Sequence, residues 1–176
     1  LKRINKGFLF AFDQDNEAIQ YSTERLKDFD NFKIIKSNFA NMKECLLKEN
    51  VKKVDGILFD IGVSSMQLDE DYRGFSYHND ARLDMRMDQE SDFSAYNVVN
   101  EYSEKELRDI IFKYGEEKYS PLIAKKIVKV RETKTIDTTT ELADVILSAV
   151  PAHVRRSGKH PAKKIFQALR IAVNDE

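Results

Sequence analysis

The sequence has 176 residues, a length that suits one medium-sized domain or a core with a smaller lobe. Its hydrophobic content of 41% and charged content of 34% exclude wholesale disorder and permit a packed core. The net charge of −1 favours neither an acidic nor a basic partner, and the single cysteine, Cys45, excludes an internal disulfide and a multi-cysteine metal site. No stretch approaches membrane-spanning length, so we expect a cytoplasmic protein that does not contact a membrane.

The first part of the chain alternates predicted strands and helices. Short apolar runs within 8–12, 32–39 and 54–62 predict strands. Between them, residues 15–29 and 40–50 carry apolar side chains at helical spacing. The order strand, helix, strand, helix, strand predicts an α/β fold in which right-handed crossovers connect the strands of a parallel sheet.

From about residue 90 the pattern changes to helices alone. Ser103 with Glu106, and Thr138 with Glu141, have the spacing of capping boxes that begin helices. Pro121 is suited to the first position of another helix, and a last amphipathic helix is predicted from about residue 161. The chain is therefore predicted to consist of an α/β part followed by a helical part.

Two predicted strands end in residues that suit a nucleotide-like cofactor. In open parallel sheets, ligands bind beyond the carboxyl ends of the strands, where Asp13 and Phe39 are expected. A carboxylate can accept hydrogen bonds from both ribose hydroxyls, and an aromatic ring can cover a purine. The alternative is that Asp13 caps the helix behind it and that Phe39 belongs to the core.

Asp60 follows the third apolar run directly. An unpaired charge at the end of a buried strand is costly, so a functional role explains this carboxylate better than a structural one does. Ser64, Ser65 and Gln67 then offer hydrogen-bond donors and acceptors at the same edge. A helix cap or a solvated turn would explain the serines equally well.

Residues 73–88 alternate arginines with aromatic and acidic residues. Arg73, Phe75 and Arg86 suit a surface that contacts phosphates and bases of RNA. The alternative is internal pairing of arginine with aspartate, which would lock an ordered loop. Both explanations are compatible with the sequence.

A second basic region covers residues 153–164, which contain no acidic residue. Arg155, Arg156 and Lys159 in this run, with Lys125 on a preceding helix, are candidates for phosphate contacts. A solvated loop is the alternative. The histidines are too scattered in the sequence for a metal site, and no metal is expected.

Four segments carry a resemblance to a known family. The stretches DGILFDIGVSSMQLDEDYRGFSY, LDMRMD, YGEEKY and KHPAKKIFQALRIAVNDE occur in this order. They resemble the MraW/RsmH family of bacterial S-adenosylmethionine-dependent 16S rRNA (cytosine-N(4))-methyltransferases. The resemblance implies a class I methyltransferase fold, which is a Rossmann-like parallel sheet with an inserted all-helical domain. It also implies that the substrate is a cytosine in the decoding region of the small ribosomal subunit.

Carried over by position, the family's S-adenosylmethionine contacts fall on Asp13, Phe39, Asp60 and Gln67. The loop departs from the family pattern at Met66, where the family usually has proline, but Gln67 is retained. The implied organisation is a partial methyltransferase core over 1–90, a substrate-recognising helical insertion over 91–158, and a helix returning to the core over 159–176. No residue is assigned as a catalytic base.

The resemblance also predicts that this chain lacks some elements of the family's fold. Few residues precede the first apolar run, so we expect the family's first strand and glycine-rich loop, and its C-terminal strands, to be absent. The chain alone is therefore predicted to be inactive or very weak. Two other functions remain as alternatives: a non-catalytic RNA-binding module, and a nicotinamide-dependent dehydrogenase, which also has an acidic residue after its second strand.

Overall fold

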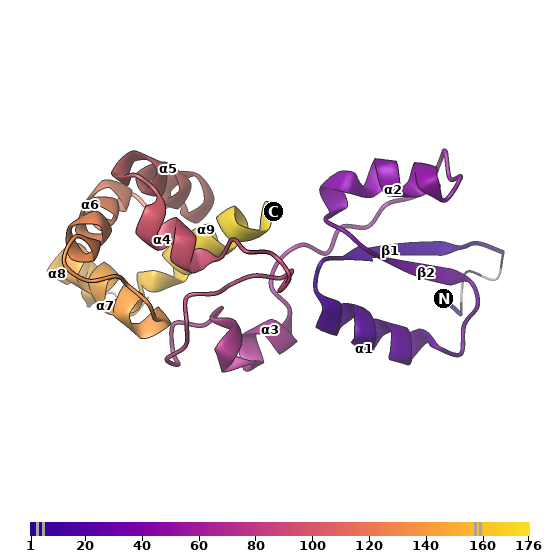
Figure 1. Cartoon of the computed structure of the whole chain (residues 1–176), viewed down its shortest axis with the longest axis horizontal. Coiled ribbons are helices and arrows are strands. Elements are labelled where there is room, and N and C mark those ends of the chain that lie inside the picture. Colours follow the sequence, from indigo (N-terminus) through magenta and orange to yellow (C-terminus); the bar gives the residue numbers. More distant parts are fainter. Residues whose placement is uncertain (3, 5, 157, 159) are drawn as a thin grey trace. The chain divides into compact units, whose positions relative to one another are not determined.

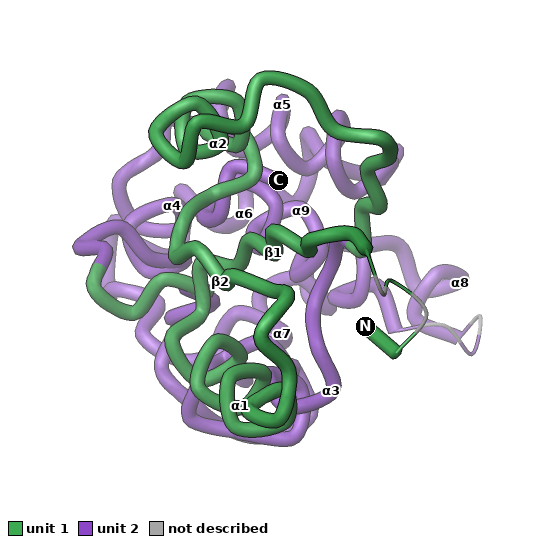
Figure 2. The backbone as a smooth tube through the Cα atoms, turned by 90° about the vertical axis from the view of Figure 1, so that its right-hand side faces the viewer, with its two compact units in different colours: residues 1–60, 87–90 green, residues 61–86, 91–176 purple. Residues whose placement is uncertain are grey.

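A computed structural model describes residues 1–2, 4, 6–156, 158 and 160–176 (Figure 1). Its elements are β1 (Leu9–Asp13), α1 (Asn16–Leu26), β2 (Phe32–Lys36), η1 (Phe39–Asn41), α2 (Met42–Lys48), α3 (Ser65–Asp69), η2 (Asp71–Arg73), α4 (Ala95–Glu101), α5 (Glu104–Gly115), α6 (Ser120–Arg131), α7 (Thr139–Ala149), α8 (Ala152–Arg155) and α9 (Ala162–Asn174). The chain forms two compact units, residues 1–60 with 87–90 and residues 61–86 with 91–176 (Figure 2).

The first unit contains a β–α–β crossover, as the sequence predicts. Strands β1 and β2 pair in parallel, from Leu9 opposite Phe32 to Asp13 opposite Lys36. Helix α1 lies on one side of this strand pair and α2 on the other (Figure 1). Asp15 begins α1 by accepting a hydrogen bond from the backbone N–H of Glu17 at 3.1 Å. The parallel pair places the carboxyl ends of both strands at one edge.

The third predicted strand does not form, and this prediction is wrong for the described structure. Residues 55–60 have no strand assignment, and the sheet of the described residues has the order β1–β2. Leu58 is 93% exposed and Ile57 57% exposed, so the apolar run is not buried either. A strand requires a hydrogen-bonding neighbour, and hydrophobicity alone does not supply one. Among the described residues, no segment pairs with this run.

The second unit is built from helices around an apolar core. Helix α5 packs against α6 and α9, and α6 packs against α7 (Figure 1). Large side chains of these helices that are fully buried include Leu107, Ile111, Ile123, Ile127, Leu142, Ile146, Ile165 and Leu169. Burying side chains of this size drives the packing of amphipathic helices. No helix among the described residues is long and apolar enough to cross a membrane.

The predicted helix ends of this unit are confirmed. Ser103 with Glu106, and Thr138 with Glu141, both form reciprocal capping boxes. Pro121 lies in the first turn of α6. These local interactions satisfy backbone N–H groups that have no partner inside the helix.

Residues 74–86 of the long connection before α4 belong to the helical unit. Leu83 and Met85 within it are completely buried. The hydroxyl of Thr139 donates to the carbonyl oxygen of Asn79 at 2.7 Å and accepts from the N–H of Ala81 at 3.0 Å. These contacts explain why residues 61–86 group with the helices rather than with β1 and β2. The functional division at residues 90 and 158 remains a prediction.

Candidate functional site

Asp13 lies at the carboxyl edge of the strand pair, where the sequence places it. One carboxylate oxygen accepts a hydrogen bond from the N–H of Asp15 at 2.9 Å, and the residue is exposed. Its backbone carbonyl accepts from the N–H of Ser37 at 2.9 Å, which joins it to the residue after β2. The carboxylate therefore supports the turn before α1, while Asp15 is the helix cap. A second carboxylate oxygen is available for a ligand hydroxyl.

Phe39 lies at the same edge and contacts a ring that the sequence analysis did not single out. Its ring meets that of Phe59 edge-to-face, with the centroids 5.9 Å apart and the planes at 79°. Phe39 is half-buried and Phe59 is 54% exposed. This contact brings the segment that ends in Asp60 to the carboxyl edge without a third strand. The aromatic contact is typical of edge-to-face pairs, which prefer centroid separations of about 4.5–7 Å.

The expectation that Asp60 follows a buried strand is wrong. The residue does not end a buried strand: it is exposed, and so are the residues around it. No desolvation cost therefore singles out this carboxylate. What the structure provides is an exposed carboxylate directly after Phe59, whose ring contacts Phe39.

A short acidic segment, residues 87–90, also reaches this edge and was missed by the sequence analysis. The ammonium group of Lys36 lies 3.2 Å from a carboxylate oxygen of Asp88 and 2.7 Å from one of Glu90. Asn16, the first residue of α1, donates to Glu90 at 3.1 Å. The hydrogen bond to Glu90 is the main reason that the pKa of Lys36 is raised, and the same contact lowers the pKa of Glu90.

Gln67 belongs to the second unit and has a defined local role. Its side-chain oxygen accepts from the N–H of Ser64 at 2.9 Å, while its own N–H donates to the hydroxyl of Ser64 at 3.2 Å. The pair is a capping box that begins α3, and Gln67 is 5% exposed. The alternative explanation of the serines as part of a helix cap is thus confirmed for Ser64.

Arg73, Phe75 and Arg86 take part in internal contacts. Arg73 is 3% exposed and donates to the carbonyl oxygen of Arg86 at 3.0 Å, and its guanidinium lies 5.8 Å from the centre of the Phe75 ring. Arg86 forms an ion pair with Asp84 at 2.7 Å. Internal arginine–aspartate pairing is therefore present in this loop. Because Arg73 and Phe75 are buried, we do not include them in a surface for RNA.

The remaining basic candidates are exposed. Lys125 lies on α6, and Arg155 and Arg156 lie at the end of α8; all three are exposed to solvent. Lys159 lies outside the described residues. Exposed cations of this kind are free to contact phosphates.

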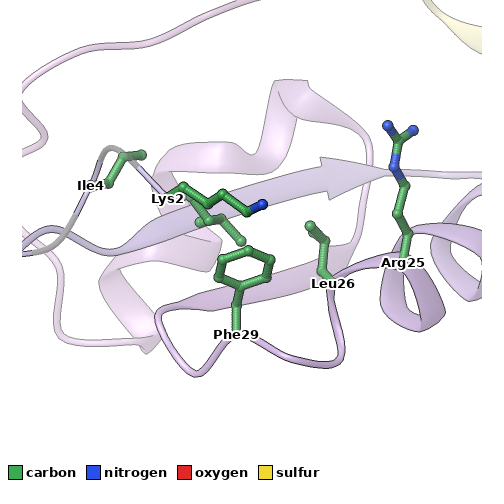
Figure 3. Close-up of a pocket in the computed structure, with 6 residues that line it drawn as sticks. Lys2, Ile4, Arg25, Leu26 and Phe29 are labelled. Carbon is green, nitrogen blue, oxygen red and sulfur yellow. The ribbon is translucent and has the colours of Figure 1, made fainter.

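The cavity in Figure 3 is not part of the carboxyl edge. It has a volume of about 670 Å³, and Leu1, Lys2, Ile4, Arg25, Leu26 and Phe29 line it. Arg25 and Leu26 are in the last turn of α1, and Phe29 precedes β2, so the cavity lies toward the amino ends of the strands. None of the candidate cofactor residues lines it, and ligands of parallel sheets bind at the opposite edge.

The small parallel sheet with its flanking helices defines a mixed α/β protein that is consistent with a methyltransferase fold. The sequence profile described as the MraW methylase family matches residues 1–176, and the chain belongs to this family. This result confirms the resemblance carried by the sequence segments.

Two curated relatives are similar over essentially the whole chain. The protein named Ribosomal RNA small subunit methyltransferase H from Exiguobacterium sibiricum is 58% identical over 177 residues, which cover 100% of this chain and 57% of the relative. A protein of the same name from Oceanobacillus iheyensis is 56% identical over 176 residues, which cover 99% of this chain and 54% of the relative. The chain thus spans about half the length of the curated relatives it matches.

Proposed function

We propose that the chain is part of an S-adenosylmethionine-dependent methyltransferase that modifies the exocyclic amine of a cytosine in the decoding region of 16S rRNA. The observation that carries this proposal is membership of the MraW methylase family over residues 1–176. The names of the two relatives, which are ribosomal RNA small subunit methyltransferases, support the substrate class. Family membership also argues against the dehydrogenase alternative.

The residues at the carboxyl edge fit the proposed cofactor chemically. Asp13 offers a carboxylate oxygen to the ribose hydroxyls, and Phe39 offers an aromatic ring for the adenine. Asp60 adds a second exposed carboxylate, and Gln67 is the fourth position carried over from the family. Two carboxylates also favour a positively charged ligand by Coulomb attraction.

The proposed chemistry relies on positioning. S-adenosylmethionine supplies a methyl group on a positively charged sulfur. The lone pair of the cytosine amine is delocalised into the ring, so this nitrogen is a weak nucleophile. Acceptors on residues 60–65 would polarise its N–H bonds and hold the nitrogen in line with the methyl group, and most of the rate gain would then come from orientation and electrostatics.

The exposed lysine and arginines of the helical unit are proposed to bind phosphates. Substituting Lys125, Arg155 and Arg156 together with alanine should weaken RNA binding for all sequences alike. For single-stranded RNA, each lost phosphate contact should flatten the slope of log K against log salt concentration by about 0.7. Fluorescence anisotropy over a series of salt concentrations measures this slope. An unchanged slope would remove these three residues from the RNA surface.

The cofactor assignment is tested by calorimetric titration of S-adenosylmethionine. Asp60→Ala should weaken binding by about 10- to 150-fold, because a hydrogen bond to a charged group contributes about 1.5–3 kcal/mol. Asp55→Ala is the matched control, because Asp55 is an exposed aspartate in the same irregular segment. The Exiguobacterium sibiricum relative, which is 58% identical to this chain, is titrated with S-adenosylmethionine in parallel.

The outcomes separate the candidate functions. Loss of binding with Asp60→Ala but not with Asp55→Ala, together with transfer of labelled methyl from S-adenosylmethionine to small-subunit RNA, supports the methyltransferase. RNA binding without any uptake of S-adenosylmethionine in either protein would favour the non-catalytic RNA-binding module. Equal effects of both substitutions would show that Asp60 has no particular role.

A further inference from the structure

Two histidines that are far apart in the sequence meet at one tyrosine in the helical unit. The ring of Tyr77 stacks on that of His160, with centroids 4.7 Å apart and planes at 16°. The ring of His78 lies 4.4 Å from that of Tyr77 at 39°. Phe166 of α9 supports Tyr77 edge-to-face at 5.5 Å and is itself buried. We name Tyr77, His78 and His160 the ring cluster.

The ring cluster is anchored on one side and open on the other. Tyr77 is half-buried against Phe166, whereas His78 and His160 are both exposed. A tyrosine held in this way has little rotamer freedom left to lose when a ligand binds. The two imidazole rings therefore offer flat, exposed surfaces on a fixed support.

The protonation state of His160 follows from its hydrogen bond. Its Nδ1 accepts from the backbone N–H of Ala162 at 3.2 Å, so the ring proton is on Nε2 in the neutral form. Burial lowers the pKa of His160, and the nearby His78 lowers it further, although Asp144 acts in the opposite direction. The neutral ring can stack on an aromatic system while its Nε2–H serves as a hydrogen-bond donor.

The chain around His160 is strongly basic. No aspartate or glutamate occurs between Asp144 and Asp175, and this stretch includes the exposed Arg155, Arg156 and Lys163. Stacking rings joined to a basic segment of the chain match a ligand that combines flat bases with phosphates. A metal ion fits less well, because no group of three or more metal-binding side chains occurs among the described residues.

We propose that the ring cluster is a stacking site for an unpaired base of single-stranded RNA, and that the arginines of the same basic segment bind its phosphates. An incoming base extends the existing stack by covering an exposed imidazole ring, and the Nε2–H of His160 is available to a carbonyl oxygen of the base. This inference rests on the proposed function in one respect, that the ligand is RNA. It adds a contact outside the carboxyl edge and requires no cofactor.

The test compares a short fluorescent oligocytidylate with an abasic strand of the same length and charge, measured by anisotropy without S-adenosylmethionine. His160→Ala should weaken binding of the oligocytidylate about fivefold or more, the lower end of what one base–aromatic stack contributes, and leave the abasic strand unaffected. His78→Ala should act in the same direction. Tyr77→Phe keeps the ring and should bind like the wild type.

His153→Ala is the matched control. His153 is also an exposed histidine of the basic region, but its ring contacts Tyr119, with a hydrogen bond of 3.1 Å, and not Tyr77. The His153→Ala substitution should not change the ratio of the affinities for the oligocytidylate and the abasic strand. Circular dichroism of each variant verifies that the helices remain folded.

Three results would overturn the proposal. The first is a wild-type chain that binds both strands equally, and the second is a His160→Ala variant that weakens both by the same factor. The third is an acidic peptide that binds as tightly as the oligocytidylate, which would assign this surface to electrostatic attraction alone. None of these results depends on methyl transfer, so the cofactor titration with Asp60→Ala still decides the proposed function separately.

Discussion

Helices α5 and α9 approach closely at Gly115, and replacing this glycine with alanine tests how the two helices are held together. A Cβ atom at this position would lie 2.6 Å from the carbonyl oxygen of Lys164 and 3.4 Å from the Cβ of Ala168. Backbone atoms cannot rotate away from such a contact, so α9 would have to shift. Two hydrogen bonds would be strained as a result. Lys164 donates to the carbonyl of Glu116 at 2.9 Å, and Gln167 donates to that of Tyr114 at 3.0 Å.

Two opposing contributions determine how much Gly115→Ala changes the free energy of unfolding. Overpacking of a well-packed contact costs about 1–3 kcal/mol. Alanine has a higher helix propensity than glycine by about 1 kcal/mol, but Gly115 is the last residue of α5, where less of this gain applies. We therefore expect Gly115→Ala to lower the free energy of unfolding by about 1–2 kcal/mol. In a chain of this size, each kcal/mol corresponds to a decrease in Tm of about 2–4 °C.

The assay is urea and thermal unfolding followed by far-ultraviolet circular dichroism, which reports the helices of the second unit. Gly56→Ala is the matched control, because a Cβ at Gly56 would have nothing within 4 Å. That substitution should change the free energy of unfolding by less than about 0.5 kcal/mol. A Gly115→Ala variant that is as stable as Gly56→Ala would refute the close contact between α5 and α9.

Three further predictions concern Asp84, Ser64 and Gln67. Burial raises the pKa of Asp84, but the hydrogen bonds and charge of Arg86, with a contribution from Arg73, outweigh it and leave the pKa below its ordinary value of 3.8. The ionised carboxylate therefore stabilises the folded chain above pH 3.8, and this stabilisation is lost as the pH falls through the lowered pKa. The free energy of unfolding, measured with urea, should thus decrease less steeply at acid pH in Asp84→Asn than in the wild type. Equally steep decreases in both proteins would contradict this prediction. Ser64→Ala should loosen the start of α3 by about 1 kcal/mol. If Gln67 contacts S-adenosylmethionine directly, Gln67→Ala should reduce the affinity for this cofactor, measured by calorimetry, far more than Ser64→Ala does. Equal losses of affinity in the two variants would give Gln67 a purely structural role.

Local features of the fold were predictable because they depend on neighbouring residues. A capping box needs only a serine or threonine and a glutamate three residues later, so Ser103 and Thr138 could be identified as helix starts. The β–α–β crossover over residues 9–36 was predictable from apolar runs separated by an amphipathic segment.

The candidate site could be predicted only in part. The β–α–β order makes the two strands parallel, and the carboxyl ends of parallel strands lie at the same edge of the sheet. Asp13, the last residue of β1, and Phe39, which follows β2, therefore lie at the carboxyl edge. Asp60 was inferred from an apolar run that was expected to form a buried strand, and that expectation is wrong. Apolar composition measures the preference of a segment for burial, but it does not show whether a neighbouring strand is there to pair with it.

The sequence by itself determined the order of the elements, the helix caps and, through four segments, the family. Only the tertiary structure decided which distant residues meet, because such contacts depend on how helices and loops pack rather than on local spacing. It buried Arg73 and Phe75, joined Lys36 to the acidic residues of 87–90, and brought His160 to Tyr77 across more than eighty residues of chain. It also explains why residue 115 is glycine, since the backbone of α9 occupies the space that a side chain would need.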